Sequence, residues 1–412
     1  MGNCLNVSRA STKLKFIRDL DSICRLNGVR PLRIGFVSIQ DASDVTTWSG
    51  IPFQILKQLR AQGIQVEVFS PLSPKVKYVH AAAKILAKAR SKSVTLDHFP
   101  VVLRSYARQI EAHLRERPVD VIVSTSTIPI TLLRCKQPIV VWTDAVFHSM
   151  IDYYDGAFAN LTKRAKARGK LQEETALQRC TLVAYSSTWA IEAAKKHVDA
   201  SKLRLLPFGS SLPVQHTAEE VATQARQKRV TRHNKCELLF VGVDWERKGG
   251  EIAIETARLL NDAGIETRLR VVGSHPPAHS PDFVECLGFI NKSSPQGLQR
   301  LAELFQSADF FILPTKAEAA GIVFCEACAF GVPPLTYATG GTADYVRTGL
   351  NGVCFAPGAP ASEFAARIQK LLSNPAEYEA LSAGAFMEYK NRLNWEKSVQ
   401  QLVQFCELCR QA

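Results

Sequence analysis

Two carboxylates in the stretch 310–345 have the type and spacing to bind a ligand rich in hydroxyl groups. The apolar run Phe310 to Leu313 is typical of a buried parallel strand, and the loop that follows it carries Glu318. Gly321 then begins a predicted helix of small and apolar residues, in which Glu326 is the one charged side chain. Because a carboxylate among apolar neighbours is costly unless it is paired, we expect a partner for Glu326.

A strand, a glycine and a helix N-terminus follow one another in this stretch, and this order favours an anion site. In open α/β sheets, ligands bind beyond the carboxyl ends of the strands, where helix N-termini present free amides. Two carboxylate acceptors at the same edge suit a ligand that carries hydroxyls as well as phosphate. The stretch continues with Gly331–Val332–Pro333 after the helix and with Gly340–Gly341 after the next apolar run.

The combined pattern resembles a known donor-site signature. Glu318 and Glu326 with seven residues between them, Gly321, and the two glycine motifs are similar to those of retaining nucleotide-sugar glycosyltransferases of family 4 (glycosyl transferases group 1), which have the GT-B fold. The resemblance implies an α/β protein of two Rossmann-like, doubly wound domains, with a C-terminal helix that crosses back to the first domain. It also implies a nucleotide-sugar donor as co-substrate, no cofactor and no bound metal.

Changes in composition along the chain predict where the domains begin and end. We expect an N-terminal appendage at residues 1–30, a first domain at 31–212, a hinge at 213–236, a second domain at 237–390 and a final helix at 391–412. The resemblance implies that the first domain lies on the acceptor side, that the second binds the donor, and that the final helix crosses back to the first domain. Residues 75–92 combine lysines with an apolar periodicity, which is typical of a solvated surface helix or of a helix lying on an anionic membrane. The basic run 163–170 is expected to be a solvated loop, with contact to an anionic acceptor or a lipid headgroup as the alternative.

Charge is distributed unevenly between the two halves of the 412-residue chain. Residues 1–240 hold 36 lysines and arginines against 19 acidic residues, whereas the remainder holds 15 against 19. A basic first half favours an anionic acceptor or an anionic membrane surface, and the chain has no recognised nucleic-acid-binding motif. No apolar run approaches 18 residues. We therefore expect a cytoplasmic protein, with peripheral membrane contact as an open alternative and no nucleic-acid partner.

Two CxxC pairs among the eleven cysteines raise the possibility of a zinc site. The pairs are Cys325/Cys328 and Cys406/Cys409. Both fall in stretches with a helical pattern rather than in turns, and no secretory segment precedes them. We therefore interpret them as buried small hydrophobes.

Two loops that precede predicted helices are candidates for holding the donor phosphates. Ser49 and Gly50 are compatible with an ordinary helix cap or with a phosphate contact, and the resemblance favours the contact. Arg247 and Lys248 lie at the start of another predicted helix, near the positive end of its dipole. The resemblance implies a donor contact for Lys248. The family's usual arginine position is Val243 here, so Arg247 is the candidate to replace it.

The resemblance implies further donor contacts. Glu318 would accept hydrogen bonds from the donor sugar and Glu326 from the ribose. The backbone of Gly288, Phe289 and Ile290 would meet the nucleobase, and the amides of Ala320, Gly321 and Ile322 would position the donor.

Asp144 follows a predicted strand of the first domain, at about the position where much of the family has a histidine near the reacting sugar. A carboxylate at the carboxyl end of a strand is well placed for a site. The candidates for catalysis are thus Glu318, Asp144 and Lys248.

The sequence predicts a retaining, metal-independent hexosyltransferase. The donor would be a UDP or GDP sugar, and the acceptor a hydroxyl of a carbohydrate, a lipid-linked or a small molecule, as in polysaccharide or glycolipid synthesis. Two alternatives stay open. One is a nucleotide-sugar epimerase or phosphorylase with the same fold, and the other is a non-catalytic protein that binds sugar nucleotides.

Overall fold

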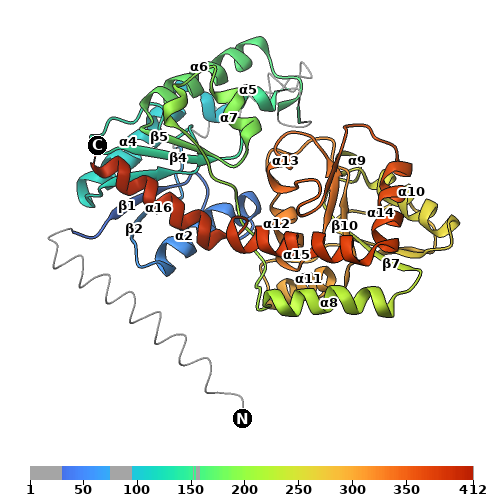
Figure 1. Cartoon of the computed structure of the whole chain (residues 1–412). Helices are drawn as coiled ribbons and strands as arrows, with labels where there is room; N and C mark the ends of the chain where they lie inside the picture. The colour runs from blue at the N-terminus through green and yellow to red at the C-terminus, as the bar shows by residue number, and fades with distance from the viewer. Residues whose placement is uncertain (1–29, 75–94, 152, 155–157, 412) are drawn as a thin grey trace.

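The computed structural model describes residues 30–74, 95–151, 153–154 and 158–411. They form two lobes, each built on one six-stranded sheet (Figure 1). The order is β2-β1-β3-β4-β5-β6 in the first sheet and β12-β11-β10-β7-β8-β9 in the second, and every strand pair is parallel. The predicted appendage, apart from Arg30, and the basic segment 75–92 lie outside the described residues.

The first domain has the predicted alternation of strands and helices. Its central strands are buried along their length, because helices cover both faces of the sheet. Phe36, for example, is opposite Val68 on one neighbouring strand and Val123 on the other. The elements are β1 (Arg33–Val37), α2 (Ile51–Ala61), β2 (Gln65–Phe69), α4 (Pro100–Glu116), β3 (Val121–Ser124), β4 (Ile139–Thr143), α5 (Phe147–Met150), α6 (Lys163–Arg179), β5 (Leu182–Tyr185), α7 (Thr188–Ala194) and β6 (Leu203–Leu205).

The second domain repeats this architecture. Its elements are α8 (Ala218–Thr231), β7 (Lys235–Val241), α9 (Trp245–Lys248), α10 (Gly250–Asp262), β8 (Glu266–Val272), β9 (Val284–Cys286), α11 (Pro295–Ser307), β10 (Phe310–Leu313), α12 (Ile322–Ala329), β11 (Pro334–Tyr337), α13 (Thr342–Tyr345), β12 (Val353–Phe355), α14 (Ala361–Ser373) and α15 (Pro375–Asn391). Strand β10, which leads into the site, lies between β11 and β7 in the middle of the sheet.

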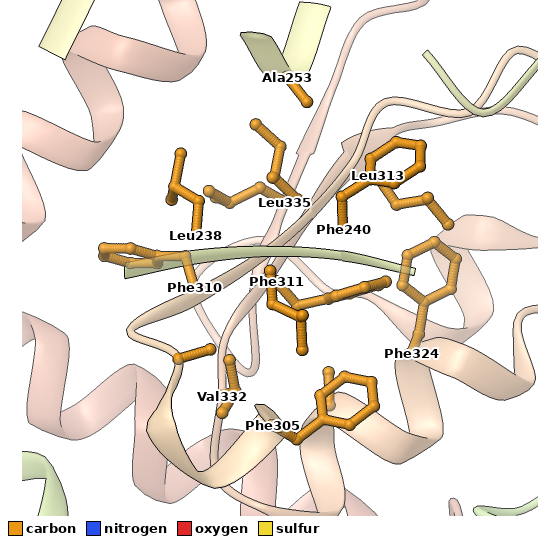
Figure 2. Close-up of a cluster of buried hydrophobic side chains, with 14 of the residues drawn as sticks. Leu238, Phe240, Ala253, Phe305, Phe310, Phe311, Leu313, Phe324, Val332 and Leu335 are labelled. Carbon is orange, nitrogen blue, oxygen red and sulfur yellow. The ribbon is translucent and has the colours of Figure 1, made fainter. Parts of the chain in front are cut away.

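Aromatic side chains dominate the core around β10. Figure 2 shows Phe310 and Phe311 packed among residues of β7 and of the flanking helices. The ring of Phe311 contacts Phe305 of α11 and Phe324 of α12, with centroids 5.6 and 5.8 Å apart. Aromatic rings bury large apolar areas in fixed orientations, so this packing fixes α12 against the end of β10.

The final helix, α16 (Trp395–Gln411), crosses from the second domain to the first, as predicted (Figure 1). Its apolar face, including Trp395, Val399 and Leu402, is buried with the first domain's core. The backbone carbonyl of Glu396 also accepts a hydrogen bond from Gln62 at 3.0 Å. The helix therefore ties the two lobes together.

The predicted hinge at 213–236 is wrong for most of its length, because this segment contains helix α8. Thr217 caps this helix in a capping box with Glu220. Arg229 and Arg232 of α8 both pair with Asp309, which is fully buried at the start of β10. Since a buried carboxylate needs such partners, α8 is held to the second domain. The crossing between the lobes falls earlier in the chain, near Phe208.

A second correction concerns the basic run 163–170, predicted to be a loop. It forms the first half of α6, with Thr162 as the N-cap whose hydroxyl accepts from the amide of Ala165 at 3.1 Å. Closely spaced cations gave no helical periodicity, yet Ala165 and Gly169 face the interior. The burial of this face decides the helix, as tertiary packing commonly does.

Candidate active site

A cavity of about 500 Å³ lies between the two domains. The first domain contributes the loop before α2 and the end of β4, and the second contributes the loops after β7, β9 and β10 together with the start of α12. These segments follow the carboxyl ends of parallel strands, where open α/β sheets bind ligands.

Lys248 and Glu318 form an ion pair at this cavity. The Nζ atom of Lys248 donates to Oε2 of Glu318, and their side chains are 12% and 14% exposed. Gly249 follows Lys248 with a φ of +78°, and a Cβ there would collide with the carbonyl oxygen of Pro314. Glycine therefore permits the close approach of the two loops, which brings the lysine onto the carboxylate.

Arg247, the residue before Lys248 in α9, is held by side-chain hydrogen bonds of its own. Its Nε donates to Asp244 at 3.0 Å, and one terminal nitrogen donates to the carbonyl of Ala317 at 2.9 Å. The guanidinium carbon also lies 5.5 Å from the centre of the Tyr154 ring, within range of a cation–π contact. Arg247 thus lines the cavity in a fixed orientation, and the anion at its side is Asp244.

Glu326 has the partner that its apolar surroundings demand, and the partner is Lys292. The ammonium of Lys292 lies 2.7 and 2.8 Å from the two carboxylate oxygens. The Glu326 side chain is fully buried, whereas that of Lys292 is 40% exposed and lines the cavity. Glu326 itself is not part of the cavity wall. For a ligand to reach it, Lys292 must turn away.

Asp144 lines the cavity on the side of the first domain, next to the Trp48 side chain. Burial raises the pKa of Asp144 to about 6, and the nearby charge of Glu318 acts in the same direction. Trp48 and Ser49 have φ values of +44° and +57°, which non-glycine residues seldom adopt. Such strain is concentrated at functional sites, and here it belongs to the loop that brings the indole to Asp144.

Two tyrosines of the first domain contact the loop that carries Glu318. The amide of Glu318 donates to the Tyr153 hydroxyl at 3.0 Å, and the amide of Ala319 donates to the Tyr154 hydroxyl at 2.6 Å. The Tyr153 hydroxyl is also 3.1 Å from that of Thr339. A Cβ at Gly340 would collide with the same hydroxyl. The first domain therefore helps to set the position of Glu318.

The structure brings ten of the thirteen predicted site residues to the cavity wall and leaves three outside it. Those on the wall are Asp144, Lys248, Glu318, Arg247, Ser49, Phe289, Ile290, Ala320, Gly321 and Ile322. Gly50 is the left-handed N-cap of α2, and Gly288 accepts from the amide of Gly273 at 2.9 Å. Glu326, the third, lies behind Lys292.

Sequence reasoning missed Lys292, Trp48, Tyr153 and Tyr154. Lys292 comes two residues after the predicted nucleobase segment, and no periodicity or motif indicates its partner. The tandem tyrosines of the first domain are a visible signal, because aromatic hydroxyls in a polar loop often bind across interfaces. Their target is 165 residues away in the chain, so only the fold reveals it.

The CxxC cysteines are free and buried in helices α12 and α16, as the helical pattern predicts. Burial raises the pKa of Cys328 to about 12, which keeps its thiol protonated. Within the described part of the chain, no three histidine, cysteine or acidic side chains gather as metal ligands would. No helix in these same ranges has the length and apolar character needed to cross a membrane.

Two Rossmann-like domains, a cavity between their carboxyl edges and a crossing C-terminal helix together define the GT-B class of fold. Residues 221–388 match the sequence model "Glycosyl transferases group 1", and residues 53–211 match "Glycosyltransferase Family 4". The two matches cover most of both domains. The chain belongs to the glycosyl transferases of group 1.

Curated relatives include lipopolysaccharide glucosyltransferase WaaG of Escherichia coli (strain K12). It is 28% identical over 259 residues, which cover 61% of this chain and 67% of WaaG. D-inositol 3-phosphate glycosyltransferase of Geodermatophilus obscurus is 29% identical over 220 residues, which cover 50% of this chain and 48% of that protein. The chain thus spans about half the length of this second relative.

Solved structures share the fold at lower identity. Anabaena Alr3699/HepE in complex with UDP and glucose superposes with a TM-score of 0.58 at 16% identity, covering 92% of this chain and 100% of that one. Sucrose-phosphate synthase of Thermosynechococcus elongatus gives 0.62 at 17% identity, covering 92% and 99%. These likenesses show the architecture of both domains and their connection.

Proposed function

We propose that this protein transfers a sugar from a nucleotide-diphosphate donor to an acceptor hydroxyl, with the anomeric configuration retained. The observation that carries the proposal is the meeting of Arg247, Lys248 and Glu318 with Asp144 in one cavity between the domains. This set supplies cations for a leaving diphosphate and carboxylates for hydroxyl groups. It needs no metal ion and no cofactor.

In the proposed complex, the donor breaks the ion pair between Lys248 and Glu318, and each of the two side chains then contacts the donor. A bound sugar nucleotide places phosphate oxygens next to donor-sugar hydroxyls, so the lysine turns to the phosphate and the carboxylate accepts from the sugar. Fixed cations stabilise the charge that develops on the leaving diphosphate. The amides of Ala320, Gly321 and Ile322 lie at the start of α12, where they add donors directed at an anion.

Glu326 and Lys292 form a second pair, next to the predicted nucleobase segment. In the proposed complex, Lys292 turns outward into the cavity and the ribose hydroxyls donate to the buried carboxylate. The binding free energy from this contact is then the difference between the hydrogen bonds of Glu326 to the ribose and those to Lys292. The affinity therefore depends on how easily Lys292 is rehydrated. Because the side chain of Lys292 is 40% exposed, returning its ammonium group to water costs little free energy.

The proposed donor is a UDP or GDP sugar, and the similar proteins support UDP. The HepE structure is described as a complex with UDP and glucose, and WaaG is named a lipopolysaccharide glucosyltransferase. We place the protein in the cytoplasm, acting in polysaccharide or glycolipid synthesis, and peripheral contact with an anionic membrane stays an open alternative. The acceptor carries a carbohydrate, lipid-linked or small-molecule hydroxyl.

The test is a thermal-shift panel of UDP, GDP, ADP and their sugars. It is run on the wild type, on Glu326→Gln and on Glu388→Gln. Glu388 is a carboxylate of the same domain that pairs with Arg392 outside the cavity, which makes its variant the matched control. A ligand that binds only the folded state raises the melting temperature. We expect one nucleotide to stabilise the wild type and the control, and to lose most of this effect in Glu326→Gln.

Other outcomes would point to the alternatives. A protein that binds a sugar nucleotide but neither transfers nor hydrolyses it would be a non-catalytic binding protein. Release of a free sugar phosphate would indicate a phosphorylase, and conversion of the donor into its epimer would indicate an epimerase. A nucleotide shift that is equal in all three proteins would mean that Glu326 does not contact the ribose.

A further inference from the structure

A second cavity, of about 300 Å³, opens at the carboxyl edge of the first domain's sheet. It is formed where β1, β3 and β4 end. Its described lining residues are Ser38, Ile39, Gln40, Trp48, Pro52, Asp97, Thr125, Ser126, Thr143 and Asp144. Trp48 and Asp144 also line the cavity between the domains. The two cavities therefore meet at this pair of side chains, as a donor and an acceptor site must.

The chemistry of the second cavity is that of hydrogen bonds to neutral hydroxyl groups. Four serine and threonine residues, one glutamine and two aspartates line it. The described lining residues include no lysine, arginine or histidine. Hydroxyls and amides both donate and accept, whereas the carboxylates accept only, so the set matches a ligand with several hydroxyl donors.

Asp97 retains capacity to bind such a ligand. The Tyr106 hydroxyl donates to its Oδ1 at 3.0 Å, and this bond fixes the side chain. No described residue donates to Oδ2 in the structure. On the other side, Trp48 and Asp144 lie next to each other where the two cavities meet. Asp97 is thus oriented by an aromatic side chain and keeps room to accept from a hydroxyl, and Asp144 faces both cavities.

A phosphate in this cavity would lie beside two carboxylates, with no lysine, arginine or histidine among the described lining residues. At distances of several ångströms, repulsion between unit charges costs a few-fold to more than tenfold in affinity, even when solvent screens it. None of the lysines and arginines in the described part of the first 240 residues is among the lining residues of this cavity. The local side chains therefore oppose the anionic acceptor that the overall charge favours.

We propose that the second cavity binds the acceptor as an uncharged carbohydrate group, and that Asp97 and Asp144 discriminate against a phosphate on that group. This inference rests on the proposed glycosyl transfer and names its acceptor class. Asp144, next to the donor cavity, accepts from the reacting hydroxyl. Asp97 accepts from a more distant hydroxyl and acts as a specificity-determining residue.

The experiment compares matched pairs of acceptors with the donor that the nucleotide panel identifies. The pairs are methyl glucoside with its 6-phosphate and myo-inositol with its 3-phosphate. Acceptor-dependent release of nucleoside diphosphate and its kcat/KM are measured for the wild type, Asp97→Asn and Glu192→Gln. Glu192 lies on the surface of the same domain and pairs only with Lys195 among the described residues, so its variant controls for the loss of one negative charge.

We expect the wild type to use a neutral member at least about tenfold better than its phosphate, and Asp97→Asn to reduce that ratio about fivefold. Glu192→Gln should keep the wild-type ratio. Thermal shift with the nucleotide shows whether Asp97→Asn is folded. Asp97 does not line the donor cavity, so a folded variant should still bind the nucleotide.

Three results would overturn the inference. One is a phosphorylated acceptor that is used as well as or better than its neutral partner, and another is an unchanged ratio in a folded Asp97→Asn. The third is a protein that binds the donor but neither uses any neutral sugar as an acceptor nor shows a thermal shift with one at high millimolar concentration. If no nucleotide binds to the wild type, the proposed function itself fails, and the inference fails with it.

Discussion

The two sides of the site carry charges opposite to those of the domains that supply them. The first 240 residues have an excess of positive charge, yet their charged contributions to the described cavity walls include Asp97 and Asp144. The rest of the chain is slightly acidic, yet it presents Arg247, Lys248 and Lys292 to the donor cavity. Electrostatic interactions fall off within about 10 Å at ordinary ionic strength, so the nearest side chains decide what binds.

The two sides also differ in how their charges are satisfied. On the donor side, Lys248 and Lys292 are each paired with a carboxylate, which holds these cations in place. On the acceptor side, the Tyr106 hydroxyl donates to Asp97 and Trp48 lies next to Asp144, and neither carboxylate has an ion-pair partner among the described residues. The donor side is therefore arranged to exchange partners when a ligand binds, and the acceptor side to add partners.

The largest effect is expected from breaking the donor side at Lys248. Lys248→Met keeps the apolar stem but removes the cation that would stabilise the leaving diphosphate, and we expect kcat to fall about 10²- to 10³-fold. Lys235→Met is the control, because this exposed lysine of the same domain pairs only with Glu266 among the described residues. Steady-state kinetics with the identified donor give the answer. A normal kcat with a raised KM would contradict a role in the transition state.

The two members of the buried pair should differ in their effect on stability. Lys292→Met leaves the fully buried Glu326 without its cation, and we expect the free energy of unfolding to fall by about 2–4 kcal/mol. Glu326→Gln should cost less, because the partly exposed ammonium of Lys292 can regain water. Urea denaturation of both variants measures the difference. A larger loss of stability in Glu326→Gln than in Lys292→Met would show that the lysine, and not the carboxylate, depends more on the pairing.

A smaller effect is expected from titrating the acceptor side. The pKa of Asp144 is raised to about 6, so the carboxylate is mostly ionised at pH 7.5 and about one-tenth ionised at pH 5. If the ionised form accepts from the acceptor hydroxyl, the rate falls about tenfold over this range. Asp144→Asn should lose this dependence and have a low, flat pH–rate profile. A wild-type profile that is flat between pH 5 and 7.5 would exclude this role.

The same shift predicts the sign of a change in stability. Asp144 binds a proton more tightly in the folded state than in the unfolded chain, where the pKa of an aspartate is near 3.9. The contribution of Asp144 is therefore fully present below that value and is lost as the pH rises through about 6. Asp144→Asn should remove this dependence from the unfolding free energy measured across the same range.

The smallest effect is expected at the contact between the domains. Tyr153→Phe and Tyr154→Phe each remove a hydroxyl that accepts from the Glu318 loop, and each loss should cost about 1 kcal/mol. We expect a few-fold rise in the donor KM, because the loop is less well held. Trp189→Phe is a control, since this ring packs on Tyr153 without a described bond to the loop. Equal KM values for all three variants would mean that the second domain positions the loop alone.

The strands and most helices could be predicted from the sequence because each carries a local pattern. The apolar runs of β1 and β10 and the glycine after the α12 stretch give boundaries within a residue or two of those observed. Helix α8 has a local start signal, the capping box of Thr217 and Glu220, which the interpretation as a hinge did not use. Its attachment to the second domain by the pairing of Arg229 and Arg232 with Asp309 has no local signal. Only the fold brings Asp309 near them.

The features of the site also differ in whether the sequence could predict them. The motif around Glu318 and Glu326 indicated the chemistry, and the requirement for a partner at Glu326 followed from its apolar surroundings. Neither the identity of that partner nor the exclusion of Glu326 from the cavity wall followed from the motif. Lys292 lies 34 residues away and Lys248 lies 70 residues from Glu318, and no periodic pattern extends over such separations.

The sequence by itself determined the family, the two α/β domains, and which segments of the second domain lie at the carboxyl edge of its sheet. Local propensity, apolar period and a continuous motif are enough for this, because each acts over a few neighbouring residues. The tertiary structure alone decided which cation pairs with which carboxylate, and that Trp48 and Asp144 lie where the two cavities meet. These contacts join residues that are distant in the chain, and packing between the domains, not local sequence, brings them together.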